Sequence, residues 1–296
     1  MSTIKSYSVG NGDMFYVNHN SDNFSIVDCC LSGDDDPILD EIARLSSLKG
    51  ITRFISTHPD DDHFRGLGHL DKRINIRNFY CVKNGASKTE ETDCFTKYRE
   101  LHDCDKRAFH IFAGCSRKWM NQDDEERKSS GINILWPKLD NEHFKEAMES
   151  AEAGNSPNNL SPIIKYSVNK GATALWMGDL ETDFMEKIAD EISLPVVDIL
   201  FAPHHGRETG KIPEAMLQKM EPKIIVIGEA PSEHLDYYAG YNTITQNSAG
   251  DIIFEFEGSK VHIFTSNEYS VDFLDNESQT LDGHHYVGTL EVGVTA

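Results

Sequence analysis

The sequence predicts an α/β fold in which two β-sheets pack face to face and helices flank them. Three observations lead to this prediction. Short apolar segments typical of strands alternate with segments of helical periodicity along most of the 296 residues. Antiparallel hairpins are expected towards both ends of the chain. The polar residues with metal-binding chemistry follow directly after predicted strands, where the loops of a rigid sheet usually carry function.

The start of the chain is expected to form strands and then a helix. The stretches at 4–8, 14–17 and 24–27 are short and β-rich. Asn11-Gly12 lies between the first two and favours a tight turn, because Asn-Gly reaches positive φ at little cost. A helix is expected from about 34–37, where acids and a proline suit a first turn, to near Gly50. Its apolar stripe consists of Ile38, Ile42, Leu45 and Leu48.

The rest of the chain continues the alternation of strands and helices. Residues 163–168 and 173–177 lie on either side of a short turn and are expected to pair as a hairpin. Further helices are expected at 140–152, 182–192 and 212–220. Further strands are expected at 53–57, 77–82, 132–136, 196–201, 223–227, 243–245, 252–256 and 261–264.

The charge balance limits the kinds of partner. Lys and Arg number 28 against 49 Asp and Glu, which gives a net charge of −21. Such a charge opposes non-specific attraction to nucleic acid or anionic membrane, so a polyanionic substrate would need a local basic patch or a bound metal. No apolar run is long enough to span a bilayer, and the N-terminus lacks a signal-peptide pattern. We therefore expect no membrane partner and a cytoplasmic location.

The six cysteines are expected to be reduced thiols. They form no C-x-x-C pair, and a chain of this size needs no disulfides for stability. The alternative is a zinc knot, although the spacings match no common structural-zinc pattern. The residues of such a knot would be Cys94, His102, Cys104, His110 and Cys115.

One short stretch carries the strongest chemical signal in the chain. His58, Asp60, Asp62 and His63 fall within six residues, directly after the strand expected at 53–57. Imidazole and carboxylate are ligands shared by zinc, iron and manganese. Acids this close would repel one another unless a cation lay among them. The alternative is a solvated acidic turn, since Pro-Asp sequences are good turn formers.

Four further motifs accompany this stretch, and their order is informative. They are Val9-Gly10-Asn11-Gly12-Asp13, Asn158-Asn159-Leu160-Ser161, Gly178-Asp179-Leu180-Glu181 and His204-His205-Gly206. Together the five motifs resemble the metallo-β-lactamase superfamily, and most closely the C-terminal domain of bacterial competence (DNA-uptake) proteins. That resemblance implies a four-layer αββα sandwich formed by a single domain, residues 1–296. Competence-type domains are tighter in the region of 85–131, so we expect an insertion there.

The resemblance also implies a site with two divalent metal ions. His58 and Asp60 would hold one ion, and Asp62 and His63 would hold the other together with either His204 or His205. Asp179 would bridge both ions. Asp62, Asp179, His205 and Arg207 would act in catalysis. Taken alone, a Gly-Asp after a strand is often only a turn, and a strand-end histidine is often bonded to backbone.

The chain departs from the superfamily pattern at several positions. Asp60 stands where the superfamily usually has histidine, and Asn158-Asn159 occupy the region of its third histidine motif. Both changes favour manganese, with zinc as the alternative. Arg207 replaces a serine and is expected either to hold a phosphate oxygen or to form a surface salt bridge. Asp28 matches a family acid that orders the floor of the site, but Cys29-Cys30 follow it in place of Thr-Gly.

Three classes of function agree with this pattern. The first is a phosphodiesterase or nuclease acting on nucleic acid or on nucleotide phosphodiesters, which the resemblance implies. The second is a hydrolase of another bond, such as a lactone, thioester or β-lactam. The third is a metal-bound interaction module, in which residues 85–131 would contact a protein partner. Oxygen-rich ligands favour the first class over the second, because zinc acyl hydrolases use more histidines.

Overall fold

The computed structural model describes residues 1–31, 36–169 and 171–293. Its strands are β1 (Ser2–Ser6), β2 (Phe15–Asn18), β3 (Asn23–Val27), β4 (Ile51–Ile55), β5 (Phe79–Cys81), β6 (Ala108–His110), β7 (Ile132–Trp136), β8 (Ile163–Ser167), β9 (Thr173–Trp176), β10 (Ile199–Phe201), β11 (Ile224–Ile227), β12 (Thr243–Thr245), β13 (Ile252–Glu257), β14 (Lys260–Thr265) and β15 (His285–Glu291). Its α-helices are α1 (Asp36–Ser46), α2 (Asp61–Phe64), α3 (Leu67–Ile74), α4 (Asp93–His102), α5 (Glu142–Glu152), α6 (Thr182–Ile188), α7 (Glu214–Met220) and α8 (Gln246–Ala249).

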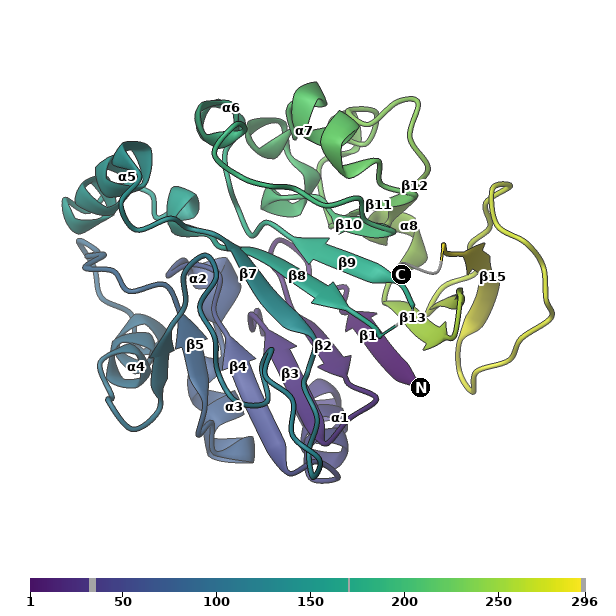
Figure 1. Ribbon diagram of the computed structural model, residues 1–296, viewed down its shortest axis with the longest axis horizontal. Helices are drawn as coiled ribbons and strands as arrows, with labels where there is room; N and C mark the ends of the chain where they lie inside the picture. The colour runs from purple at the N-terminus through teal and green to yellow at the C-terminus, as the bar shows by residue number, and fades with distance from the viewer. Residues whose placement is uncertain (32–35, 170, 294–296) are drawn as a thin grey trace.

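These elements form two facing sheets with helices on their outer faces (Figure 1). In the described chain one sheet has the order β15-β14-β13-β1-β2-β3-β4-β5-β6 and the other β12-β11-β10-β9-β8-β7. Helices α1, α3 and α4 cover the first sheet, and α5, α6 and α7 lie on the far side of the second (Figure 1). The predicted four-layer αββα sandwich is therefore confirmed.

The alternation of side chains along β4 separates two apolar layers. Phe54 faces the helices, where it stacks on Phe79 with the ring centroids 5.5 Å apart. Ile55, the next residue, faces the second sheet and joins the core between the sheets. Successive residues of a strand point to opposite faces, so a strand covered on both sides is apolar throughout. This explains the continuous apolar run that leads into the His58–His63 stretch.

Parallel strands bring the motifs to one edge of the sandwich. Strands β3, β4, β5 and β6 run parallel in the first sheet, and β9, β10, β11 and β12 run parallel in the second. The carboxyl ends of parallel strands share one edge, which is where α/β proteins usually bind ligands. The His58–His63 stretch follows β4, Asp179 follows β9, and His204 follows β10. The loop from the first sheet therefore faces the two loops from the second sheet at this edge.

Several elements differ from the sequence prediction. The acidic stretch is not all loop, because α2 begins at Asp61 and the Asp60 side chain caps it. Strand β15 and helix α3 were not expected. The first helix is present from Asp36, while the residues at 34 and 35 lie outside the described part of the chain.

The region 85–131 contributes to the main fold. It contains α4, which packs on the first sheet, and β6, which forms one edge of that sheet. Its description as an insertion stays a prediction. Among the helices of the described residues, none has the length and apolar character required to cross a membrane.

The layer under α1, α3 and α4 supplies a stability prediction. Phe54 is fully buried, so Phe54→Ala should lower the free energy of unfolding by about 3–5 kcal/mol, from lost apolar burial and the cavity left behind. Leu48 is 72% exposed, and Leu48→Ala should change the free energy of unfolding by less than about 0.5 kcal/mol. Chemical denaturation measures both, and equal effects would contradict this account of the core.

Candidate metal centre

The loop after β4 is held in place by Asp28, which directly follows β3. The Asp28 carboxylate accepts hydrogen bonds from Thr57 N at 2.8 Å and from Thr57 Oγ1 at 2.7 Å. It also accepts one at 2.8 Å from Nδ1 of His63. The backbone of Asp28 is left-handed, with φ of 55°, which turns the chain so that its carboxylate reaches this loop. Asp28 therefore fixes the orientation of His63.

His63 and His58 direct their free ring nitrogens to the same carboxylate. Nε2 of His63 lies 3.1 Å from Oδ1 of Asp179, and Nε2 of His58 lies 3.9 Å from Oδ2 of Asp179. On the other side of its ring, His58 Nδ1 lies 3.1 Å from Thr57 Oγ1 and 3.2 Å from Ser161 Oγ. Since the Thr57 hydroxyl donates to Asp28, its oxygen can accept from His58 Nδ1.

His204 and His205 repeat this arrangement from the second sheet. Nε2 of each lies 3.7 Å from Oδ2 of Asp179. His205 Nδ1 donates to Asp13 Oδ1 at 3.0 Å, and His204 Nδ1 lies 2.8 Å from Thr209 Oγ1. The sequence left open which of the two histidines faces the site, and the structure brings both to Asp179.

The backbone of the His-His-Gly motif is strained. His204, His205 and Gly206 have φ of 52°, 56° and 87°, all in the left-handed region. A Cβ on Gly206 would lie 2.5 Å from Cγ2 of Ile227, so glycine is required there by space as well as by φ. Non-glycine residues rarely adopt this conformation, and such strain clusters at functional sites. Here it turns two consecutive imidazoles towards one carboxylate.

Asp62 and Asp13 complete the acidic part of the cluster. Asp62 Oδ2 lies 3.4 Å from His205 Nε2, and Asp62 Oδ1 lies 3.9 Å from His63 Nε2. The backbone N of Asp13 donates to Asp62 O at 3.1 Å, which joins the first motif to the α2 loop. Gly12 allows this approach, since a Cβ there would lie 2.6 Å from that oxygen.

The Asn158–Ser161 motif supports the cluster through hydrogen bonds. Ser161 Oγ accepts from the backbone N of Asp179 at 3.0 Å, in addition to its contact with His58. The Asn158 and Asn159 amides donate to the Glu181 carboxylate at 3.3 and 2.9 Å. These amides therefore secure the loop after β9. They do not enrich the cluster in oxygen, although the sequence had predicted that they would.

Asp60 and Arg207 have other partners. The Asp60 carboxylate accepts from Asp61 N at 2.9 Å and from Lys88 Nζ at 2.8 Å. Within the described residues, no hydrogen bond or ion pair joins it to the histidines. The Arg207 guanidinium donates to Asn11 Oδ1.

The chain is similar to known proteins in sequence and in fold. The family model described as the metallo-beta-lactamase superfamily matches residues 7–151. The structure of Igni18, a metallo hydrolase from the hyperthermophilic archaeon Ignicoccus hospitalis, is similar over 86% of this chain and 100% of its own, with 14% identity and a TM-score of 0.50. The chain has the metallo-beta-lactamase fold.

CmlA, a diiron beta-hydroxylase from Streptomyces venezuelae, is similar over 77% of this chain and 44% of its own, with 12% identity and a TM-score of 0.41. No curated protein matches the chain. The family model covers residues 7–151, just under half of the chain, and the likeness to Igni18 shows the fold.

The charged side chains of this cluster shift one another's pKa values. Burial would raise the pKa of Asp179, but His63, His205 and His58 hold it well below its usual value. Burial would lower the pKa of His205, but Asp13 and Asp179 raise it to about 10. Burial and the charge of His63 lower the pKa of His58 to about 4. Buried carboxylates thus require positive charge beside them, supplied either by protons on histidine or by cations.

Orphaned atoms show that the cluster fits metal ions. His58 Nε2, His63 Nε2, His205 Nε2 and Asp179 Oδ1 are buried and have no hydrogen-bond partner of acceptable geometry in the described chain. Buried polar atoms are almost always satisfied, so four that converge need a common partner. Asp13, His63, Asp179 and His205 each offer a ligand atom within 4.8 Å of the others. Metal-bound histidines usually donate their second N–H to a carboxylate, as His63 and His205 do here.

Sequence reasoning missed Asp13 as a member of the site and Lys88 as a neighbour of it. Asp13 ends the Val-Gly-Asn-Gly-Asp motif, so its position in that motif was the available signal. Lys88 carries no sequence signal, because its contact with Asp60 depends on the path of the chain after β5.

The cluster predicts the metal content of variants. Asp179→Asn should bind about two metal ions per chain fewer than the wild type, since it removes the carboxylate that all four histidines face. Asp62→Ala should also lose metal. Asp61→Asn is the matched control, because Asp61 lies on the same helix but contacts Lys88 and Thr92. Elemental analysis of the purified proteins measures this, and full metal content in Asp179→Asn would refute the assignment.

Proposed function

We propose that the protein is a dinuclear metal-dependent hydrolase that cleaves a phosphodiester bond in a nucleic acid or a nucleotide. The observation that carries this proposal is the convergence of four imidazole Nε2 atoms on Asp179, each with its Nδ1 bound on the opposite side. The likeness of the five motifs to competence-type domains supports the phosphodiesterase part of the proposal.

The proposed ligands come from both sheets. They are His58, Asp60, Asp62, His63, Asp179, His204 and His205. Asp179 would be shared between the two ions, because it faces histidines from β4 and from β10. Asp60 can bind either Lys88 or a metal ion, so its part in the set requires the contact with Lys88 to open.

Divalent ions in such a site make a bound water more acidic and neutralise charge on the oxygens of a phosphoryl group. The chain contributes fixed geometry to this chemistry. Hydrogen bonds to Asp28 and Asp13 set the tautomers of His63 and His205, so each ring presents Nε2 to the cluster. Asp62 and Asp179 would keep the ions in place.

Two cations at the edge of the cluster are candidates for binding a phosphate. Arg207 directly follows the His-His-Gly motif and is held by Asn11, so its guanidinium can offer paired N–H donors to a phosphate oxygen. Lys88 lies beside Asp60 and lines a cavity of about 220 Å³ with Pro59 and the turn at 154–157. We propose that this cavity receives part of the substrate next to the metal ions.

The choice of metal follows from the donor types. The sequence favoured manganese because Asp60 and two asparagines were expected to make the site rich in oxygen. The asparagines bind Glu181, and four imidazoles face Asp179, a set that suits zinc as well as manganese. We therefore propose two divalent ions and test both metals.

The histidine content also supports a second candidate function. Zinc enzymes that hydrolyse acyl bonds use several imidazoles, so a lactone, thioester or β-lactam is the alternative substrate class. The phosphodiester is preferred because Arg207 and Lys88 both lie at the edge of the site. A metal-bound interaction module, with a protein partner at residues 85–131, is the third proposal.

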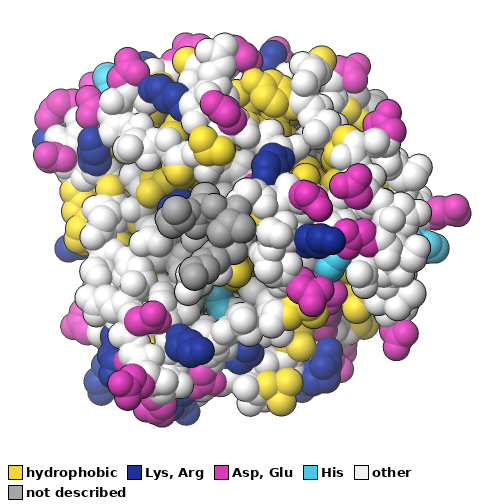
Figure 2. Space-filling model, turned by 45° about the vertical axis from the view of Figure 1, so that its right-hand side comes forward, with side chains coloured by type: hydrophobic (Ala, Val, Ile, Leu, Met, Phe, Trp, Pro, Cys, Tyr) yellow, Lys and Arg dark blue, Asp and Glu magenta, His cyan; other side chains and the backbone are white. Residues whose placement is uncertain are grey.

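Surface charge bears on the size of the substrate. On the face in Figure 2, acidic side chains are spread among basic ones, and its described residues form no continuous basic patch. The chain carries a net charge of −21. Long duplex DNA requires many cationic contacts, so we propose a small phosphodiester or one delivered by a partner.

The proposed activity is tested with a panel of substrates and metals. Manganese, magnesium and zinc should be combined with a bis-aryl phosphodiester, single-stranded DNA and RNA, cyclic dinucleotides, a lactone, a thioester and a cephalosporin. We expect phosphodiester hydrolysis, with Arg207→Met lowering kcat/KM about 100-fold through lost charge stabilisation. Arg73→Met is the control, because Arg73 pairs with Asp40 on the surface.

Two results would contradict the proposal. Hydrolysis of only the lactone, thioester or cephalosporin would assign the protein to the second class. A fully metal-loaded protein with no activity on the panel would favour the interaction module.

A further inference from the structure

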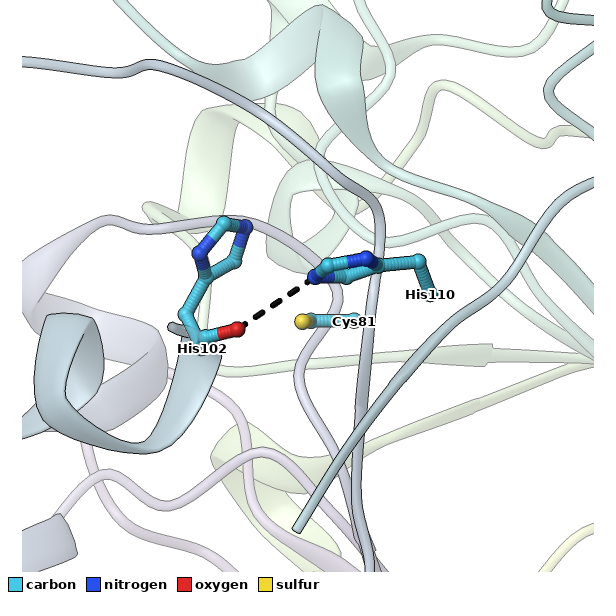
Figure 3. Close-up of side chains that lie close together, drawn as sticks. All are labelled: Cys81, His102 and His110. Carbon is cyan, nitrogen blue, oxygen red and sulfur yellow. Dashed lines mark hydrogen bonds between the residues drawn. The ribbon is translucent and has the colours of Figure 1, made fainter. Parts of the chain in front are cut away.

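A second group of metal-ligating side chains lies apart from the site described above. Cys81, His102 and His110 each offer a ligand atom within 4.8 Å of the others. The sulfur of Cys81 lies beside the His110 ring and points to the side on which His102 lies (Figure 3). The ring centroids of His102 and His110 are 5.0 Å apart. This group shares no residue with the cluster around Asp179.

Three elements end at this point, and each contributes its last residue. Cys81 ends β5 and His110 ends β6, and the two are register partners in this parallel pair. His102 ends α4, which packs over the same face of the sheet. Cys81 points to that face, because Phe79, two residues earlier, also lies in the helix-covered layer. Strand register and helix packing thus determine the group.

His102 is oriented as metal ligands usually are. Its Nδ1–H donates to Asp103 Oδ1 at 2.7 Å, which leaves the lone pair on Nε2. Nε2 accepts only a long hydrogen bond, 3.3 Å, from the backbone N of Asn84. A histidine bound to a carboxylate on one side and directed at a cation on the other is the common arrangement in metal sites. Its place at the carboxyl end of α4 also favours positive charge.

Cys81 supplies a thiol that stays protonated unless a cation binds it. Cys81 is buried, and burial raises the pKa of its thiol. A metal ion reverses this effect, since it binds the thiolate directly. His110 is only half-buried and its Nε2 makes a long contact of 3.3 Å with the carbonyl of His102, so its ring can turn. The group therefore has one fixed imidazole, one adjustable imidazole and one thiol.

We propose that Cys81, His102 and His110 bind one zinc ion, with water as the fourth ligand. One thiolate and two imidazoles are a donor set that zinc prefers. Ligand atoms around tetrahedral zinc lie roughly 3.5 Å apart, so these three, which lie within 4.8 Å of one another, must close in by up to about 1.3 Å. The bound ion would join the end of α4 to the edge of the first sheet.

This site differs from the zinc knot weighed from the sequence. That knot combined His102 and His110 with Cys94, Cys104 and Cys115. These three cysteines do not belong to the group. These three thiols and Cys81 are free. Cys81 was absent from the knot because only the register of β5 with β6 places it beside His110. The proposal also reverses the expectation that the cysteines form no second metal site.

Cobalt provides a direct test, because a thiolate bound to Co²⁺ gives a charge-transfer absorption in the near ultraviolet that imidazole and carboxylate ligands do not give. The protein, stripped of metal, is titrated with Co²⁺. We expect an absorption whose amplitude at saturation corresponds to about one thiolate-bound Co²⁺ per chain, in addition to the two ions proposed beside Asp179. It should persist in Asp179→Asn, which isolates the test from the proposed hydrolase site. Asp103→Asn should weaken binding about 10–100-fold while the absorption at saturation remains.

Variants decide which residues bind the ion. Cys81→Ser and His110→Ala should each abolish the absorption, and His110 is half-buried, so its variant tests the site even if Cys81→Ser fails to fold. Cys104→Ser and Cys30→Ser are the controls, from the same α4–β6 region and from the neighbourhood of Asp62. Absorption that survives His110→Ala, or that disappears in Cys30→Ser, would overturn the proposal. So would its absence in the saturated wild type.

Discussion

The burial of Asp179 among four imidazoles is the constraint on which the rest of the structure depends. A carboxylate in this position is stable only with positive charge beside it. His63, 3.1 Å away, is the nearest of the four imidazoles. Because the histidines come from loops of both sheets, the cluster joins the two sheets at this edge. The cluster is therefore a structural centre as well as a candidate chemical one.

Carboxylates and hydroxyls behind the cluster give it a single arrangement. Asp28 orients His63, Asp13 orients His205, and Ser161 contacts both His58 and the backbone of Asp179. These three partners belong to three different loops, so the orientation of each imidazole depends on the overall fold. Left-handed backbone at His204 and His205 is stable for the same reason, since the surrounding contacts compensate its strain.

The sequence predicts the frame of the molecule well where side-chain periodicity is strong. Strands β7 and β12 lie where the apolar patterns placed them, and the hairpin of β8 and β9 is present. Helix α2 was missed because its four residues also resemble a turn. Strand β15 was missed because it begins with polar residues and follows a long irregular stretch. Local periodicity carries no information on such elements, which depend on partners distant in the sequence.

The candidate site is likewise predicted only in part by the sequence. The motifs identify residues with the right chemistry, and His58, His63, His204 and His205 all face Asp179. They do not reveal that Lys88 binds Asp60 or that the Asn158 amide binds Glu181, since those contacts arise from loops that meet only in the folded chain. The group of Cys81, His102 and His110 is another example, because strand register creates it.

Anomalous X-ray diffraction tests the central claim most directly. Crystals of the protein grown with zinc or manganese should be measured at the absorption edge of the added metal. We expect two anomalous peaks beside Asp179, about 3.5–4 Å apart and within bonding distance of His58, His63, Asp62 and the His204–His205 pair. Crystals with metal bound elsewhere and no peak beside Asp179 would contradict this claim.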